Sequence, residues 1–186
     1  MVAEELKMLS PLEKYVLMLL YVGGGAKGQL WFQKEVFVLS RTFKDLVDEL
    51  DFEAYGNGPY SEALEWCRNA LENSGLVIGT QLTEEGRVIA ATLWEIATER
   101  EREIIKATAE FFESLERDEL LLYFAVMYSD TVEKSKKIDR ILKQREEIAL
   151  RMLRGGKVSL SLAAVLAGLP IEEMVDRAVE KRINIF

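Results

Sequence analysis

The sequence predicts a mainly α-helical protein with a winged-helix-like module first, a long helical connector next and a helix-turn-helix module last. Apolar residues recur at helical spacing through most of the 186 residues. Serine or threonine stands at several expected helix starts, and only residues 76–82 have the composition of a strand. We expect three parts, at residues 1–90, 91–130 and 131–186.

The first module is expected to hold four helices followed by one short strand. Ser10, Pro11 and Glu13 have the spacing of a capping box and mark the first helix start. Helices followed by one short β element are typical of a winged helix. The expected elements are helices at residues 11–22, 30–40, 43–50 and 61–73 and the strand at residues 76–82.

A single long helix is expected over residues 83–115, because its apolar residues keep to one face. Its middle, residues 98–103, is charged all round, so we expect this stretch to be solvated and to span between packed regions. Residues 118–128 are apolar on nearly every side and are expected in the central core. One further helix is expected over residues 132–154.

The sharpest local pattern joins two short helices, residues 160–167 and 170–182, at a tight turn. Ala164 is small enough for close helix packing, and Gly168 accepts the turn conformation. This spacing is typical of a helix-turn-helix, and also of an ordinary helical hairpin. Carboxylates on the second helix would face DNA phosphates, which disfavours DNA reading. These carboxylates are Glu172, Glu173 and Asp176.

The charge of the chain is unevenly distributed. The net charge of −8 argues against nonspecific nucleic-acid binding by the whole surface. Residues 134–157, however, hold nine basic and three acidic side chains. A stripe of these cations is the best candidate for phosphate contacts, and its alternative is a solvated helix face with i,i+4 ion pairs. The stripe is Lys136, Arg140 and Lys143, continued by Arg151 and Arg154.

The candidate DNA-contacting residues come from two segments. The helix at residues 61–73 would enter the major groove, although it also carries Glu62, Glu65 and Glu72. The second segment is the cationic stretch at residues 134–157. The candidates are Arg68, Asn69, Lys134, Lys136, Lys137, Arg140, Lys143 and Lys157.

Catalytic chemistry is not expected, and neither a metal nor a cofactor site is predicted. The chain has no histidine, which removes the commonest general base and metal ligand. Its one cysteine, Cys67, lies on an apolar helix face and is expected in a core. The glycine-rich residues 23–28 follow a helix and lack the Lys-Ser/Thr pair of a phosphate loop. Three carboxylates are expected to be solvated, Glu99, Glu103 and Glu110.

A cytoplasmic location without membrane contact is expected. The longest apolar stretch, residues 120–128, is far shorter than the ~20 residues that cross a bilayer. Residues 1–7 lack the features of a secretory signal. Few glutamines beside many Glu, Lys and Arg indicate a thermophilic source. Apolar stripes around residues 89–96 and 104–115 pack either within one chain or in a symmetric pair, and we expect a homodimer.

Residues 151–185 contain the runs Gly156-Lys157-Val158-Ser159, Ala163-Ala164-Val165-Leu166-Ala167-Gly168 and Glu172-Glu173-Met174. Together these runs resemble a small uncharacterised prokaryotic family of antitoxin-like helix-turn-helix proteins, many of them archaeal. This resemblance implies a regulatory role.

The front half also carries three motifs: Gln33-Lys34 with Phe37, Gly58-Pro59-Tyr60-Ser61, and Leu82-Thr83-Glu84-Glu85-Gly86. Through them it is similar, more loosely, to archaeal and phage-associated winged-helix proteins.

Two functional hypotheses follow. The first is a DNA-binding transcriptional regulator or antitoxin-like regulatory protein, bound to double-stranded DNA with strong salt dependence. The alternative is a protein-interaction module whose acidic helices bind a basic partner without DNA affinity. An enzyme of unfamiliar type ranks third, and a deep pocket with converging polar groups would revive it.

Overall fold

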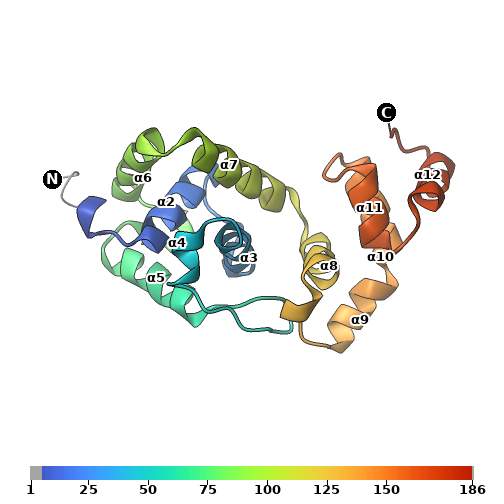
Figure 1. The fold of residues 1–186 in the computed structure, drawn as a ribbon, viewed down its shortest axis with the longest axis horizontal. Coiled ribbons are helices and arrows are strands. Elements are labelled where there is room, and N and C mark those ends of the chain that lie inside the picture. Colours follow the sequence, from blue (N-terminus) through green and yellow to red (C-terminus); the bar gives the residue numbers. More distant parts are fainter. Residues whose placement is uncertain (1–5, 186) are drawn as a thin grey trace. The chain divides into compact units, whose positions relative to one another are not determined.

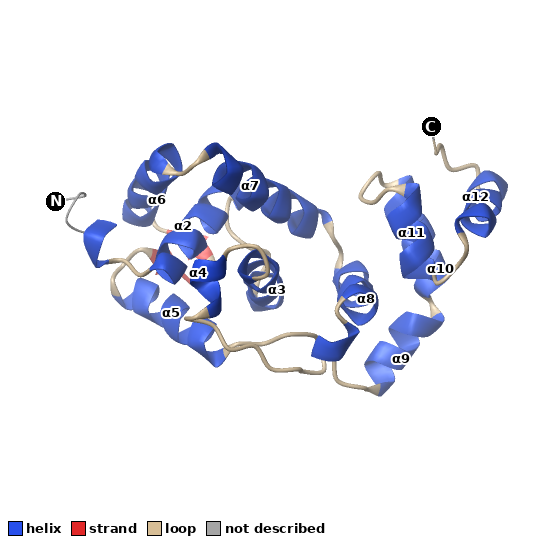
Figure 2. Ribbon diagram, in the orientation of Figure 1, coloured by secondary structure: helices blue, strands red, loops and turns tan. Residues whose placement is uncertain are grey.

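The computed structural model describes residues 6–185 and is mainly helical, with one two-stranded antiparallel sheet in that part of the chain (Figure 1, Figure 2). The prediction of a mainly α fold is confirmed. The chain forms two compact units. Unit 1 comprises Met1–Glu53 and Pro59–Glu113, and unit 2 comprises Ala54–Gly58 and Ser114–Phe186.

Unit 1 is built around α2. Leu17 and Leu20 of this helix are completely buried, and α2 packs against α4, α5, β2 and α6. The predicted capping box is confirmed, since Ser10 Oγ accepts from the Glu13 N–H at 3.2 Å and the Glu13 carboxylate accepts from the Ser10 N–H at 2.8 Å. The elements are α2 (Pro11–Gly23), α3 (Gln29–Ser40), α4 (Lys44–Val47), α5 (Glu62–Asn73), β1 (Val77–Ile78), β2 (Gln81–Leu82), α6 (Glu84–Ile96) and α7 (Glu99–Ser114).

The expected single strand is a hairpin, because the chain reverses at Gly79, whose φ is +62°. Val77 pairs with Leu82, and Ile78 with Gln81. The order of α2, α3, α5 and this hairpin is the order of the helices and wing in a winged helix. The winged-helix assignment itself stays a prediction.

The expected long helix over residues 83–115 is wrong, because α6 and α7 are separate. The backbone at Ala97 is extended, with φ −64° and ψ 148°. Thr98 then starts α7 with reciprocal bonds: its Oγ1 accepts from the Glu101 N–H, and the Glu101 carboxylate accepts from the Thr98 N–H. Both helices therefore bury their apolar faces in one core, with Ile89 on α6 and Ile105 on α7. Ile89 and Ile105 are thus buried within one chain, whereas Ile96 at the end of α6 is 70% exposed. The homodimer stays a prediction.

Polar residues of α3 hold the turn that starts α5. Gln33, Lys34 and Glu35 are all buried. The Gln33 side chain donates to the Ser61 carbonyl at 3.0 Å and accepts from the Ser61 N–H at 2.9 Å. Lys34 Nζ donates to the Pro59 carbonyl at 2.9 Å. Two of the motifs behind the front-half resemblance thus bind each other and have a structural role.

The third motif of the front half ends at Gly86, where α6 passes close to the hairpin. A Cβ at Gly86 would overlap the carbonyl oxygen of Leu76. The same oxygen accepts from the Thr83 N–H at 3.0 Å, so the start of α6 is fixed directly against the hairpin. Only glycine fits this close backbone approach.

Unit 2 is organised around α8, which packs against α9, α10 and α11. Leu120, Leu122 and Phe124 of α8 are completely buried, as expected for this segment, whereas Met127 at its end is 42% exposed. The loop at residues 54–58 joins this unit through Tyr55, whose carbonyl accepts from the Glu133 N–H at 3.0 Å. The elements are α8 (Arg117–Met127), the 3-10 turn η1 (Ser129–Thr131), α9 (Lys136–Lys143), α10 (Arg145–Arg154), α11 (Leu160–Ala167) and α12 (Ile171–Glu180).

The expected helix over residues 132–154 is also wrong. Ser135 caps a new helix by accepting from the Ile138 N–H, and the backbone bends at Gln144, with φ −99° and ψ 9°. The bend lets apolar residues of both α9 and α10 pack on α8. The expected connector at residues 91–130 is not a separate part either, because α7 belongs to the core of unit 1 and α8 to unit 2.

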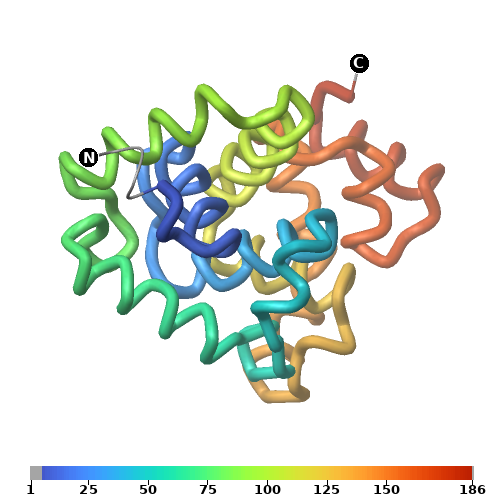
Figure 3. Tube along the Cα trace, turned by 60° about the vertical axis from the view of Figure 1, so that its left-hand side comes forward, coloured from blue at the N-terminus to red at the C-terminus, as the bar shows by residue number. Residues whose placement is uncertain are grey.

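The tight turn between α11 and α12 forms as predicted. Gly168 has φ +72°, the left-handed conformation that glycine accepts. Arg145 binds the end of α11, donating from Nε to the Leu166 carbonyl at 2.7 Å and from Nη2 to the Val165 carbonyl at 3.1 Å. The trace through α10, α11 and α12 is orange to red in Figure 3. Within residues 6–185, no helix combines the length and apolar character needed to span a bilayer.

We predict that Gly86→Ala lowers the free energy of unfolding by about 3 kcal/mol, because the added methyl forces α6 away from the Leu76 carbonyl. Urea denaturation followed by circular dichroism measures this change. Gly56→Ala is the control: a Cβ there meets open space, so the expected change is below about 0.5 kcal/mol. Equal stabilities of the two variants would contradict the close approach.

Burial lowers the pKa of Lys34 from 10.5 to about 7. Between these values the unfolded chain binds a proton that the folded protein releases, so stability rises with pH. We predict this rise between pH 7 and about 9 in the wild type, and its absence in Lys34→Met. Lys44→Met, which alters an exposed lysine, should keep it. Urea denaturation across this pH range measures the free energy of unfolding. If that free energy changed equally with pH in Lys34→Met and in the wild type, the lowered pKa of Lys34 would be refuted.

Candidate functional site

The two predicted DNA-contacting residues of α5, Arg68 and Asn69, are bound to each other, and Arg68 also pairs with carboxylates. Arg68 Nη1 lies 2.8 Å from Glu72, and Arg68 Nε lies 3.3 Å from Glu65. Arg68 Nη2 also donates to Asn69 Oδ1 at 2.6 Å. The Arg68 side chain is only 15% exposed. A DNA phosphate would have to displace these partners, so the position of Arg68 and Asn69 does not favour DNA reading by α5.

The solvent side of α5 and the hairpin is apolar and acidic. Trp66 is 65% exposed on α5, and Ile78 is 70% exposed on the hairpin. Glu62 and Glu72 are exposed on the same helix. This surface lacks the cations that neutralise phosphates in a DNA-reading helix.

The second expected DNA-reading helix, α12, has its single arginine engaged. Arg177 pairs with Glu146 at 3.2 Å, Glu173 at 3.5 Å and Glu180 at 3.7 Å. The remaining exposed charges of α12 are carboxylates. The structure therefore upholds the objection to DNA reading by this helix.

The buried carboxylate of Glu119 forms ion pairs with two cations of unit 2. Lys157 Nζ lies 2.7 Å from one carboxylate oxygen, and Arg151 Nε lies 3.3 Å from the other. Asp118 also pairs with Arg151. Burial raises the pKa of Glu119, but the hydrogen bonds from Lys157 and the Glu116 N–H outweigh it, and the pKa is lowered. Lys157 and Arg151 thus join α10 and the turn after it to α8, and this position does not favour a phosphate contact.

The remaining predicted cations form a surface that we name the α9 cationic strip. Lys136, Arg140 and Lys143 are exposed on α9 and form no ion pair within residues 6–185. Lys137 Nζ donates to Asn57 Oδ1 at 2.6 Å. The full strip is Lys134, Lys136, Lys137, Arg140 and Lys143, with Arg117 from α8.

Arg117 is the member of the strip that sequence reasoning missed. Burial lowers the pKa of Lys137, and the charges of Arg117 and Arg140 lower it further. Like charges have this effect only at short range, so the start of α8 brings Arg117 beside α9. No local pattern reveals this, because Arg117 and α9 are separated in sequence by the whole of α8.

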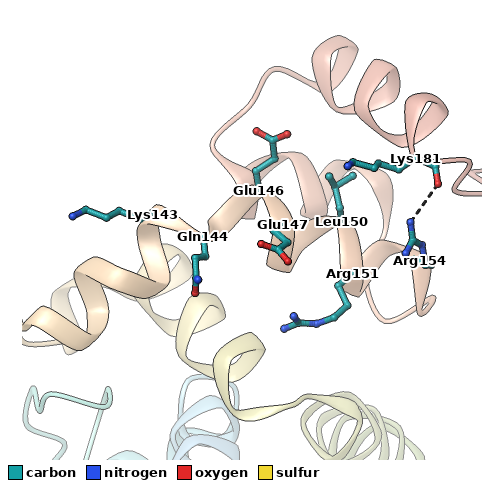
Figure 4. Close-up of a pocket in the computed structure, with 8 residues that line it drawn as sticks. All are labelled: Lys143, Gln144, Glu146, Glu147, Leu150, Arg151, Arg154 and Lys181. Carbon is teal, nitrogen blue, oxygen red and sulfur yellow. Dashed lines mark hydrogen bonds between the residues drawn. The ribbon is translucent and has the colours of Figure 1, made fainter.

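The strip leads at Lys143 into a groove of about 590 Å³ along α10 (Figure 4). Arg154 donates to the Lys181 carbonyl at 3.3 Å, which joins α10 to the chain after α12. The groove carries four cations and two carboxylates. Its lining residues are Lys143, Gln144, Glu146, Glu147, Leu150, Arg151, Arg154 and Lys181.

The cysteine of the chain lines neither of two surface grooves. Cys67 is buried, and burial followed by the charges of Glu13 and Glu49 raises its pKa to about 12, so the thiol stays protonated. A second groove, of about 270 Å³ in unit 1, has mixed apolar and charged walls that include Tyr15 and Glu101. Among residues 6–185, no group of three or more His, Cys, Asp or Glu side chains is placed to hold a metal ion.

Sequence reasoning also missed a pair of carboxyl groups in unit 1. Glu35 is buried on α3, and burial, then the charge of Glu113 and a hydrogen bond to it, raise its pKa well above 4.5. Glu113 also accepts from the Lys27 N–H at 3.1 Å. Glu35 lines neither groove, so we assign the pair a role in joining α3 to the end of α7.

We predict that Glu119→Gln destabilises the protein by about 2 kcal/mol at pH 7, because two cations lose a charged partner. A lowered folded pKa stabilises the protein above the ordinary value of 4.5, and this stabilisation is lost as the pH falls through the folded pKa. The difference between variant and wild type should therefore shrink below pH 4.5. Urea denaturation at pH 7 and pH 3 measures it. A constant difference, or an equal effect of Glu133→Gln at an exposed site, would oppose this role.

Comparison with known proteins identifies no relative. No family model, no curated protein and no solved structure matches the chain. The two sequence resemblances stay hypotheses, and the assignment of a site rests on the residues of this chain.

Proposed function

We propose that this protein is a nucleic-acid-binding regulator that contacts the phosphate backbone of double-stranded DNA with the α9 cationic strip. The distribution of ion pairs carries the proposal. Cations on α5 and α12 are bound by carboxylates, and two more are bound by Glu119. Three exposed cations of α9 have no such partner within the described residues.

The charge balance of the two units supports the same surface. Unit 1 carries 11 basic and 20 acidic residues, whereas unit 2 carries 13 basic and 12 acidic residues. A polyanion is therefore repelled by unit 1, and within unit 2 it is attracted where cations are unpaired.

Contacts to phosphate position a protein on DNA without reading its sequence. Because α5 and α12 present carboxylates where base edges would lie, we propose weak dependence on base sequence. The regulatory role agrees with the resemblance of residues 151–185 to antitoxin-like proteins.

We predict that the protein binds random duplex DNA at low salt, with a slope of log affinity against log salt of about −3 to −5. Replacing Lys136, Arg140 and Lys143 together by Glu should weaken binding at least about tenfold, because released counterions drive the association. Fluorescence anisotropy of labelled duplex measures both effects.

The matched control reverses three exposed cations of unit 1, Lys44, Arg87 and Arg100, and so changes the net charge equally. It should bind within about twofold of the wild type, since these residues lie outside the strip. Absence of binding at low salt, or an equal loss in both triple variants, would refute the proposed site.

A further inference from the structure

Helix α12 presents two adjacent rows of side chains to solvent. Met174 and Ala178 are completely buried and fix the rotation of the helix. Beside this buried side, residues four apart form an apolar row, whose middle residue is half-buried, and beyond it an exposed acidic row. The apolar row is Ile171, Val175 and Val179, and the acidic row is Glu172, Asp176 and Glu180. We name the two rows together the α12 face.

Two of the three residues of the apolar row are exposed. Ile171 is 43% exposed and Val179 is 63% exposed. Scattered apolar residues need no explanation, but these two lie on one helical row with Val175 between them. A contiguous apolar row bordered by charge is typical of a protein-binding surface.

The acidic row retains negative charge in the folded protein. Arg177 pairs with Glu180, its neighbour three residues on, but Glu172 and Asp176 have no ion pair within residues 6–185. In a DNA-binding helix-turn-helix, this helix lies in the major groove. Here its free carboxylates repel phosphates and attract lysine or arginine.

We propose that the α12 face docks a cationic amphipathic helix of another protein. Apolar side chains of that helix cover Ile171, Val175 and Val179, and this burial supplies most of the affinity. A neighbouring row of Lys or Arg on the partner meets Glu172 and Asp176, which selects the partner and its orientation. The partner is thus defined by chemistry, as a helix with apolar and basic residues in adjacent rows.

This inference goes beyond the proposed DNA contact, since it uses a different helix and the opposite charge. Binding through the α12 face needs no nucleic acid. Failure of DNA binding by the α9 cationic strip would therefore leave it intact, and the reverse also holds.

The test uses the full chain and a labelled synthetic peptide of about 18 residues, long enough to form a helix on binding. The peptide carries Leu in one helical row and Lys in the next, and a control peptide carries Glu in place of Lys. Fluorescence anisotropy should show binding of the Lys peptide and no binding of the Glu peptide.

Two variants on the α12 face make the test specific. The double variant Glu172→Gln with Asp176→Asn should bind the Lys peptide about tenfold more weakly, and Val179→Ser about fivefold more weakly. All three side chains point to solvent, so the variants should keep the wild-type circular dichroism spectrum. The matched control, Glu99→Gln with Glu103→Gln on α7, removes two exposed charges at the same spacing and should bind like the wild type.

Loss of binding in the α12 variants alone supports the docking site. Equal weakening in the α7 control would assign the binding to the overall negative charge and overturn the proposal. Absence of peptide binding by the wild type, or tighter binding of the Glu peptide, would overturn it as well.

Discussion

Hydrogen bonds between buried polar groups of α3 and the turn before α5 are the constraint on which unit 1 depends. Gln33 satisfies both backbone groups of Ser61, and Lys34 binds the Pro59 carbonyl. Buried groups left without such partners would cost more than the bonds themselves contribute. The turn is therefore held in one conformation, which sets the start of α5 and the hairpin that follows. Gly86 completes the arrangement by letting α6 begin against that hairpin.

Glu119 has the corresponding role in unit 2, with a consequence for function. A buried carboxylate is costly unless cations pair with it, and Glu119 pairs with one cation of α10 and with one of the turn after α10. Both cations, Arg151 and Lys157, belong to the basic stretch at residues 134–157, which the sequence alone indicates as a candidate for phosphate binding. Lys136, Arg140 and Lys143 of α9, by contrast, form no ion pair within residues 6–185. The packing of unit 2 thus separates cations that hold the fold from cations that remain exposed to a ligand.

The two proposals assign surfaces of opposite charge to one unit. The α9 cationic strip suits a polyanion, and the α12 face suits a cationic protein segment. Both assignments are proposals that rest on the charges of unit 2.

The sequence by itself determined the mainly helical fold, the capping box at Ser10, the core position of Cys67 and the turn at Gly168. These features depend on residues close together in the chain, whose spacing is visible in the sequence. The sequence did not reveal the helix breaks at Ala97 and Gln144, because a helical apolar pattern continues across both positions. Only packing on other helices makes these bends favourable. Tertiary structure alone also decided the candidate site. Whether a lysine or arginine is free depends on distant carboxylates such as Glu119, and the approach of Arg117 to α9 depends on how α8 packs.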